Sequence, residues 1–176
     1  MIVKGSLELS FCEINSLGKL KEVTEGLYLR RCLELKSLGK LKKVKFINLE
    51  GCLNLRSLGN LKEVSRINLE YCNSLEDLGL IEKLENFIDF YGLKSLRTLG
   101  RLKEVKGSIT LKNCSNLTSL GDLTRVDGYL NIQGCKKLNN LGKLRSVKRM
   151  ILIGGSGITE EYVKTLNDKM RNKIVQ

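Results

Sequence analysis

The stretch from Val44 to Val64 reads VKFINLEGCLNLRSLGNLKEV, which is one full unit of a repeat and the first residue of the next. Ile47 and Leu49 flank one polar residue, Cys52 follows three positions later, and a Leu-Gly pair comes near the end of the unit. The pattern recurs along the chain at intervals of 20 or 21 residues. Repeats of this length are typical of solenoids, in which short coils stack along one axis.

Each unit contains an apolar, polar, apolar triplet, which has the alternation of a half-buried strand. In the reference unit Ile47 and Leu49 are expected to face inward and Asn48 outward. A single coil cannot bury its own apolar side chains, so the coils must stack, with neighbouring strands about 4.8 Å apart in a parallel sheet. The apolar pairs are Leu7/Leu9, Leu27/Leu29, Ile47/Leu49, Ile67/Leu69, Ile88/Phe90, Ile109/Leu111, Leu130/Ile132 and Ile151/Ile153.

The string Val44-x-x-Ile47-x-Leu49-x-x-Cys52-x-x-Leu55 resembles the leucine-rich repeat signature, with cysteine where asparagine often stands. The resemblance extends from about residue 3 to residue 153, and the return segment Leu-Gly-x-Leu-x-x-Val is similar to that of bacterial and phage leucine-rich repeat proteins. It implies an α/β solenoid that is mostly β, a right-handed coil of about eight parallel strands with little helix on its convex side. It also implies a role in binding other macromolecules.

The two ends of the repeat region differ. Residues 1–154 are expected to form the solenoid and residues 155–176 a C-terminal capping helix of the same domain. Thr159 is a suitable N-cap for a helix that runs to about Asn172. Its apolar residues Tyr162, Val163, Leu166 and Met170 have helical spacing and are expected to cover the last coil. The N-terminus enters the first strand directly, and this uncovered edge predicts self-association, pairing with a partner, or a preceding segment that lies outside this sequence.

Six cysteines recur in step with the repeat, and two units carry Leu93 and Ser156 instead. Inward-pointing thiols at the start of each turn favour a ladder of buried, reduced cysteines; disulfides between stacked coils are the alternative. Reduced cysteines without an apolar signal segment favour a cytoplasmic location and no membrane partner. The six are Cys12, Cys32, Cys52, Cys72, Cys114 and Cys135.

The sequence carries no recognisable catalytic or cofactor motif. It has no histidine, no close cysteine pair for zinc, no Gly-x-Ser-x-Gly elbow and no phosphate-binding glycine loop. We therefore expect neither an enzyme nor a metal or cofactor site. Glu50, Glu70 and Asp89 fall on neighbouring strands, where the simplest interpretation is a solvated acidic patch.

The outer face of the predicted sheet is the first candidate for binding a protein partner. Aromatic side chains displayed singly among polar ones resemble the anchors and rim of a protein interface. The alternative is that the rings merely pack on neighbouring strands and cover the sheet. The candidate residues are Tyr28, Arg30, Phe46, Asn48, Glu50, Arg66, Asn68, Glu70, Phe87, Asp89, Tyr91, Lys112, Tyr129, Asn131 and Gln133.

A second candidate surface is basic. The chain has a net charge of +12, and basic residues follow most of the repeat glycines, so that stacking would align them in rows. Such rows predict an alternative function, binding of an anionic polymer such as nucleic acid, although no nucleic-acid-binding motif accompanies them. A solvated basic flank is the simpler interpretation. The residues are Lys19, Lys21, Lys40, Lys42, Lys62, Arg101, Lys103, Lys143 and Arg145.

Overall fold

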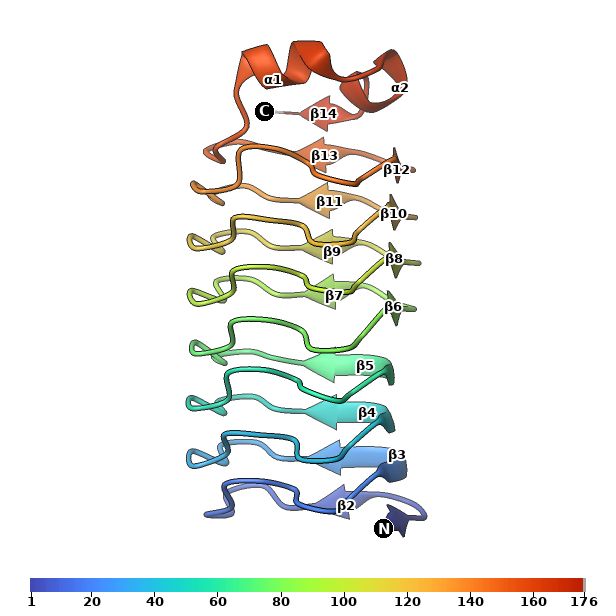
Figure 1. Ribbon diagram of the computed structural model, residues 1–176, viewed down its shortest axis with the longest axis vertical. Coiled ribbons are helices and arrows are strands. Elements are labelled where there is room, and N and C mark those ends of the chain that lie inside the picture. The colour runs from blue at the N-terminus through green and yellow to red at the C-terminus, as the bar shows by residue number, and fades with distance from the viewer. Residues whose placement is uncertain (176) are drawn as a thin grey trace.

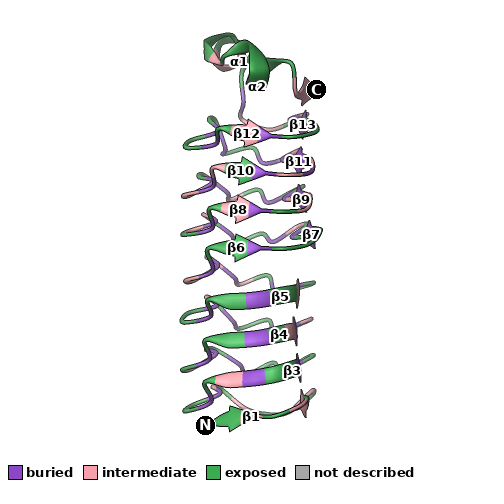
Figure 2. Ribbon diagram, turned by 90° about the vertical axis from the view of Figure 1, so that its right-hand side faces the viewer, coloured by how far each residue is buried: buried purple, intermediate pink, exposed green. Residues whose placement is uncertain are grey.

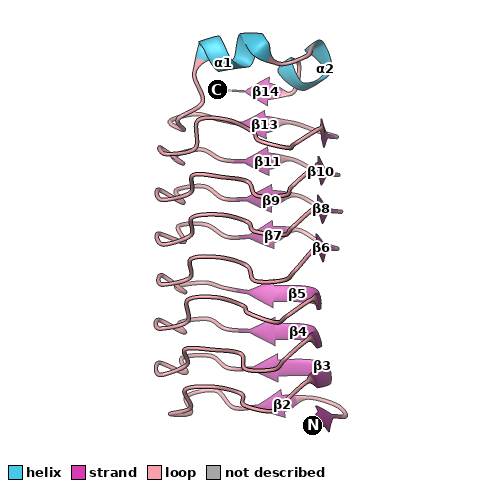
Figure 3. Ribbon diagram, viewed as in Figure 1, coloured by secondary structure: helices cyan, strands magenta, loops and turns pink. Residues whose placement is uncertain are grey.

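Each repeat forms one coil, and the coils stack into a parallel β-solenoid of about eight turns (Figure 1). The computed structural model describes residues 1–175. We number the coils from the N-terminus; they begin at residues 2, 22, 43, 63, 83, 104, 125 and 146. The expected fold class is confirmed: the coils consist of strands and turns, and helix occurs only beyond the last coil (Figure 3).

Every coil contributes strand to two adjoining sides of the solenoid. Neighbouring coils pair in parallel with equivalent residues opposite each other, as in Ile47 with Ile67 and Leu130 with Ile151. On the first side lie β1 (Ile2–Val3), β6 (Lys83–Leu84), β8 (Glu104–Val105), β10 (Arg125–Val126) and β12 (Ser146–Val147). On the second side lie β2 (Leu7–Glu8), β7 (Ile88–Asp89), β9 (Ile109–Thr110), β11 (Leu130–Asn131) and β13 (Ile151–Leu152). Three longer strands cover both sides: β3 (Glu22–Tyr28), β4 (Lys43–Asn48) and β5 (Glu63–Asn68).

In every coil except the second, the length of the corner between the two sides matches whether the coil has one strand or two. In coils three and four only two residues separate the inward valine from the next inward isoleucine, and β4 and β5 pass the corner unbroken. Coils five to eight have three residues there, and each forms two short strands. Coil two also has three, and its unbroken β3 shifts register against β4 between Val23 and Gly26, as a bulge does. The extra corner residue therefore accounts for the 21-residue intervals in the second half of the chain.

One continuous apolar core fills the solenoid (Figure 2). Within residues 1–175 no polar or charged residue is buried. Because coils above and below cover both faces of each inner coil, even single leucines lose all contact with water. In coil three the buried side chains are Val44, Ile47, Leu49, Cys52, Leu55, Leu58 and Leu61.

The repeat glycines end a small turn that their own sequence context stabilises. Gly39 and Gly59 have φ of 58° and 56°, a left-handed conformation that glycine adopts without steric cost. Their backbone N–H groups donate to the Ser37 and Ser57 hydroxyls, two residues earlier, at 2.9 and 3.0 Å. Asp77, Thr98 and Asn140 accept in the same way in other coils. The recurring Ser-Leu-Gly is thus a turn in which a side-chain oxygen satisfies the glycine amide.

The cysteines form the predicted ladder of free thiols. Each buried Sγ donates to the carbonyl oxygen of the second inward residue of the preceding coil, as in Cys52 to Leu29 at 3.1 Å and Cys114 to Phe90 at 3.1 Å. Burial raises the pKa of Cys52, Cys72 and Cys114 to about 12, which keeps the thiols protonated as donors. The thiols therefore tie each coil to the one before it.

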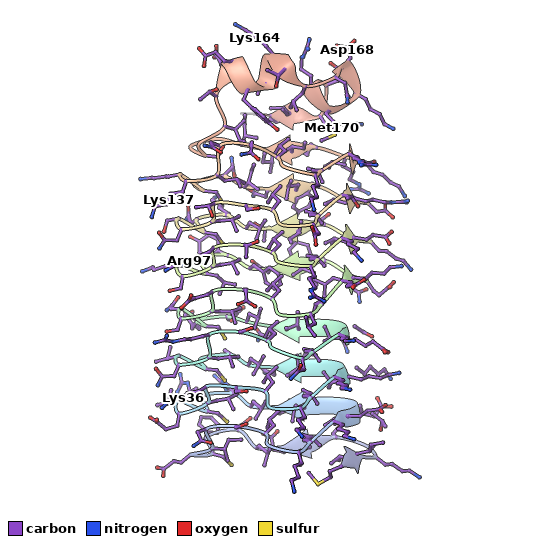
Figure 4. The ribbon with its side chains drawn as sticks, in the orientation of Figure 1. Lys36, Arg97, Lys137, Lys164, Asp168 and Met170 are labelled. Atoms are coloured by element: carbon purple, nitrogen blue, oxygen red, sulfur yellow. The ribbon has the colours of Figure 1, made fainter. Side chains whose placement is uncertain are left out.

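The C-terminal cap consists of two short helices and a strand, whereas the sequence predicts a single helix. Thr159 is the N-cap as expected, but α1 (Glu160–Thr165) ends at an extended Leu166, and Asn167 caps a second helix, α2 (Asp168–Arg171). A short strand, β14 (Ile174–Val175), which the sequence pattern did not reveal, then pairs with β13. Met170 of α2 is buried; Figure 4 shows it between the cap and the last coil. Tyr162, Val163 and Leu166 of the cap are partly buried and pack against the core.

Candidate functional site

The predicted sheet-face residues divide into three groups with different environments. The polar residues of the apolar triplets mostly bind their own backbone: Asn48, Asn68 and Asp89 accept the amide N–H two residues later at 2.8 to 3.0 Å. Asn131 does the same at 3.0 Å. These side chains shape the turn that follows the strand, as in Asx turns, and one oxygen of each is already occupied.

The second group consists of aromatic residues near the corner between the two sides. The rings of Tyr28 and Phe46 meet edge to face at 5.5 Å, and the Arg66 guanidinium lies 5.5 Å from the Phe46 ring centre. Phe87 and Tyr129 contact each other at 6.2 Å. Four of the predicted aromatic anchors therefore pack on one another across coils, as the alternative interpretation expected.

The third group lies at the turn that follows the second side, which we call the turn edge. Tyr91 lies there, and its hydroxyl oxygen accepts a hydrogen bond from the side-chain Nδ2 of Asn113 at 3.2 Å. Arg30 and Glu50 form an ion pair at 3.1 Å. Glu70, Lys112 and Gln133 occupy the same position in their coils as these two residues. The predicted site is thus split between a corner and an edge of the solenoid.

Two exposed aromatic residues at the turn edge adopt a backbone conformation that bulky side chains rarely take. Phe11 and Tyr71 have φ of 63° and 61°, and their exposed fractions are 63% and 67%. Gly51 and Gly92 occupy the equivalent position in other coils, also with positive φ. An L residue in this region costs roughly 1–2 kcal/mol, and such strain is concentrated at functional sites.

Apolar side chains and shallow hollows form a continuous groove along the turn edge of coils one to five. The first hollow, of 520 Å³, is lined by Phe11, Leu33 and Arg31 among others, and the second, of 500 Å³, shares Arg31 and Leu33 and adds Leu53 and Tyr71. The third, of 490 Å³, shares Tyr71 and adds Tyr91. All of these apolar residues are exposed, and the residues shared between neighbouring hollows join the three into one surface. We call this surface the turn-edge groove.

The turn-edge groove is acidic although the protein is basic. Glu13, Glu34, Glu70 and Asp89 line it, and none of them forms an ion pair within residues 1–175. In the C-terminal coils the same edge is basic, with Lys112, Lys136 and Lys137 on it; Figure 4 shows Lys137 on this side of the solenoid. The groove therefore differs from its surroundings in both polarity and charge.

The third hollow lies where the strand ladder is interrupted, and we call it the inter-coil slot. β5 is the last strand of one sheet, while β6 and β7 begin two new ones, and Figure 2 shows β5 and β6 further apart than neighbouring pairs. Other coils are joined by bonds such as Leu49 N–H to Asn68 O at 3.0 Å. No such backbone bond joins Leu69 to Asp89, or Tyr71 to Tyr91, anywhere in the described chain.

The sequence of coil five explains the interruption. Leu93 stands where a cysteine would donate to the Leu69 carbonyl, and the larger Phe90 occupies a position that the other coils fill with leucine or isoleucine. On the return side the two coils stay joined, since Arg97 N–H donates to Glu76 O at 2.9 Å. The two coils are therefore joined on the return side, while the strand pairing is interrupted on both strand-bearing sides and at the turn edge.

The predicted basic rows are present on the return side of the coils. Lys103 and Lys143 are neutralised by Glu82 and Asp122 at 2.8 and 2.7 Å. The other seven make no ion pair within residues 1–175: Lys19, Lys21, Lys40, Lys42, Lys62, Arg101 and Arg145. Five of these seven residues are lysines of the first three coils.

Across residues 1–175 no cluster of three or more cysteine, aspartate or glutamate side chains is arranged to hold a metal ion. None of the helices in that range has the length and apolar character needed to cross a membrane.

Comparisons with protein-family models, curated proteins and solved structures gave no match to this chain. Its function therefore has to be inferred from its own geometry.

Sequence reasoning missed Phe11, Leu33, Leu53 and Tyr71 as surface residues of interest. A signal was available in the repeat itself, because one of the two residues beside the cysteine is a leucine or an aromatic residue in each of coils one to four. At these positions the later coils carry glycine, asparagine, lysine or serine.

Proposed function

We propose that this protein is a non-enzymatic recognition scaffold that binds a protein partner through the turn-edge groove. The observation that carries the proposal is the row of exposed apolar residues, which includes two aromatics with positive φ at a turn position that coils three, five, seven and eight fill with glycine. Strain of this kind has no benefit for folding, since glycine would fit the same turn without it.

The bound segment is an extended polypeptide with apolar and basic side chains. The groove crosses four coil steps of about 4.8 Å, or about 19 Å, which matches roughly six residues of extended chain. Unpaired carboxylates along the groove complement a basic segment and would speed its association. Exposed apolar residues supply the anchors.

The resemblance to leucine-rich repeats is part of this proposal. We infer that the coils are short, cysteine-containing repeats of that kind. The buried leucines at the signature positions and the cysteine that bonds the preceding coil support the inference.

Selection of random peptides of about eight residues, displayed on phage, tests the proposal. The groove variant Phe11→Gly, Leu33→Asn and Leu53→Asn uses only residues that other coils carry at these positions, namely Gly51 and Asn73. The control variant Phe87→Ser, which introduces the residue that coil six has there as Ser108, removes an exposed ring at the corner instead. We expect selected peptides to bind the groove variant at least about tenfold more weakly and the control variant as tightly as the wild type, because a few buried anchors dominate such interfaces.

Two results would contradict protein binding at this groove. One is a selection that enriches no peptide. The other is a set of enriched peptides that lose affinity only when Phe87 is replaced, which would return the interface to the sheet face.

The free lysines on the return side favour a second candidate, an anionic polymer such as nucleic acid. Lys19, Lys21, Lys40, Lys42 and Lys62 have no acidic partner within residues 1–175. Titration of a labelled oligonucleotide distinguishes this candidate: if five phosphates are neutralised, affinity falls by about three orders of magnitude for a fourfold rise in salt. Negligible binding at low salt would exclude it.

A further inference from the structure

Of the three hollows on the turn edge, only the inter-coil slot lies where two neighbouring coils of the described chain do not pair as strands. Coils four and five are joined by backbone bonds on the return side, whereas the bonds expected at the turn edge are absent from the described residues. Ile67, just below the opening, is half-buried, whereas the equivalent Ile47 is 0% exposed. Leu69, a residue of the apolar core, lines the slot, which has a volume of 490 Å³.

Two aromatic rings and two carboxylates line this space. Tyr71 and Tyr91 are each more than half exposed, with exposed fractions of 67% and 57%. Glu70 and Asp89 come from the two different coils and form no ion pair within the described residues. Asp89 holds the Tyr91 amide through one oxygen at 2.8 Å, which leaves the other for a ligand.

The chemistry of these four side chains favours a planar cation. A guanidinium can donate to two carboxylates at once and can lie against an aromatic ring. Lys94 is the one cationic residue that lines the slot, and it pairs with neither carboxylate in the part of the chain that the structure describes. The acidic charge of the slot is therefore not neutralised from within the protein.

We propose that the inter-coil slot receives an arginine side chain of the bound polypeptide, with its guanidinium on Glu70 and Asp89 and against Tyr71 or Tyr91. This inference rests on the proposed function, since it assigns the slot as the specificity pocket of the turn-edge groove. The other hollows of the groove take the apolar side chains.

The slot can be tested with a small probe that does not depend on any peptide. N-acetyl-argininamide is titrated into isotopically labelled protein, and the backbone amide resonances are followed by NMR. N-acetyl-citrullinamide, which has nearly the same shape but no charge, is the matched probe. We expect the arginine probe to shift the amides of Tyr71, Asp89 and Tyr91 and to bind about fivefold to tenfold more tightly than the citrulline probe.

Two double variants separate the slot from the acidic edge as a whole. Glu70→Gln with Asp89→Asn removes the slot charges while keeping residues that other coils carry at the same positions, as in Gln133 and Asn131. Asparagine also preserves the bond to the next amide, as Asn48 and Asn68 show. Glu13→Gln with Glu34→Gln removes the same charge from the first hollow. We expect only the first pair to abolish the preference for arginine over citrulline.

The outcomes distinguish this inference from the proposed function. Equal binding of both probes, no shifts at the slot, or equal weakening by the two double variants would overturn the arginine pocket. In each of these cases peptides selected on the groove could still bind and lose affinity in the Phe11, Leu33 and Leu53 variant. Failure of the peptide selection alone would instead contradict the proposed function.

Discussion

Two glycines with the same turn but different neighbours give a direct test of how closely the coils stack. Gly39 and Gly59 both follow Ser-Leu, have nearly the same φ of 58° and 56°, and donate to the preceding serine hydroxyl. A Cβ added to Gly39 would lie 2.6 Å from the Gly18 carbonyl oxygen and 2.7 Å from its nitrogen. A Cβ added to Gly59 would meet nothing within 4 Å.

The expected cost of each alanine substitution follows from these contacts. Both variants place an L residue in the left-handed region, at about 1–2 kcal/mol, and both gain about 0.4–1 kcal/mol from a less flexible unfolded chain. Gly59→Ala should therefore lower the free energy of unfolding by about 1 kcal/mol. Gly39→Ala must also displace rigid backbone, which adds about 1–3 kcal/mol, as overpacking does in cores.

Urea unfolding followed by circular dichroism measures both values. The dependence of the unfolding free energy on urea should be the same in the two variants and in the wild type, which shows that the same cooperative unit unfolds. For a chain of this size, a difference of about 2 kcal/mol also separates the melting temperatures by roughly 4–8 °C. Equal destabilisation, or a larger loss in Gly59→Ala, would refute the close approach of coils one and two at this turn.

Three further predictions concern the thiol ladder and the N-terminal edge. A thiol reagent such as DTNB should modify only the half-exposed Cys12 in the native protein and the other five cysteines only after unfolding; rapid reaction of more than one thiol would contradict the ladder. Because burial raises the thiol pKa of Cys72 from 9.0 to about 12, the unfolded thiol ionises first, and stability should fall as pH rises from about 9 towards 12. Cys72→Ala, measured by urea unfolding across this range, should lose stability less steeply, and an unchanged slope would assign the pH effect to other groups. At the N-terminal edge Ile2 is 60% exposed on β1, so light scattering at rising concentration should detect association of the wild type that Ile2→Lys weakens; equal monomeric masses for both would exclude self-pairing there.

The interior of each coil could be predicted from the sequence because burial leaves few choices. The apolar pairs, the cysteines and the Leu-Gly turns repeat with one period, and every one of these positions has the same neighbours in the coil above and below. The buried, reduced thiols followed from that periodicity. The cap was predicted less well, since Asn167 competes as a second N-cap within the helical pattern and β14 depends on pairing with β13.

The candidate site could be predicted only in part. Residues such as Tyr91, Glu70 and Asp89 were found because they project outward beside an apolar triplet. Phe11 and Tyr71 were missed because they occupy a turn rather than the sheet, and Phe46 and Tyr28 proved to contact each other. No local rule in the sequence distinguishes a side chain that is free from one that packs on the next coil.

The sequence by itself determined that this chain is a stack of coils, since one apolar pattern repeated at a constant interval can be buried only by copies of itself. The tertiary structure alone decided where the stack opens and which outer side chains meet. The opening depends on how Phe90 and Leu93 of coil five fit against coil four, a contact between residues about twenty positions apart whose geometry no single repeat contains. Outer side chains are not constrained by burial, so their arrangement across coils, and with it the turn-edge groove, follows from the exact stacking of one coil on the next.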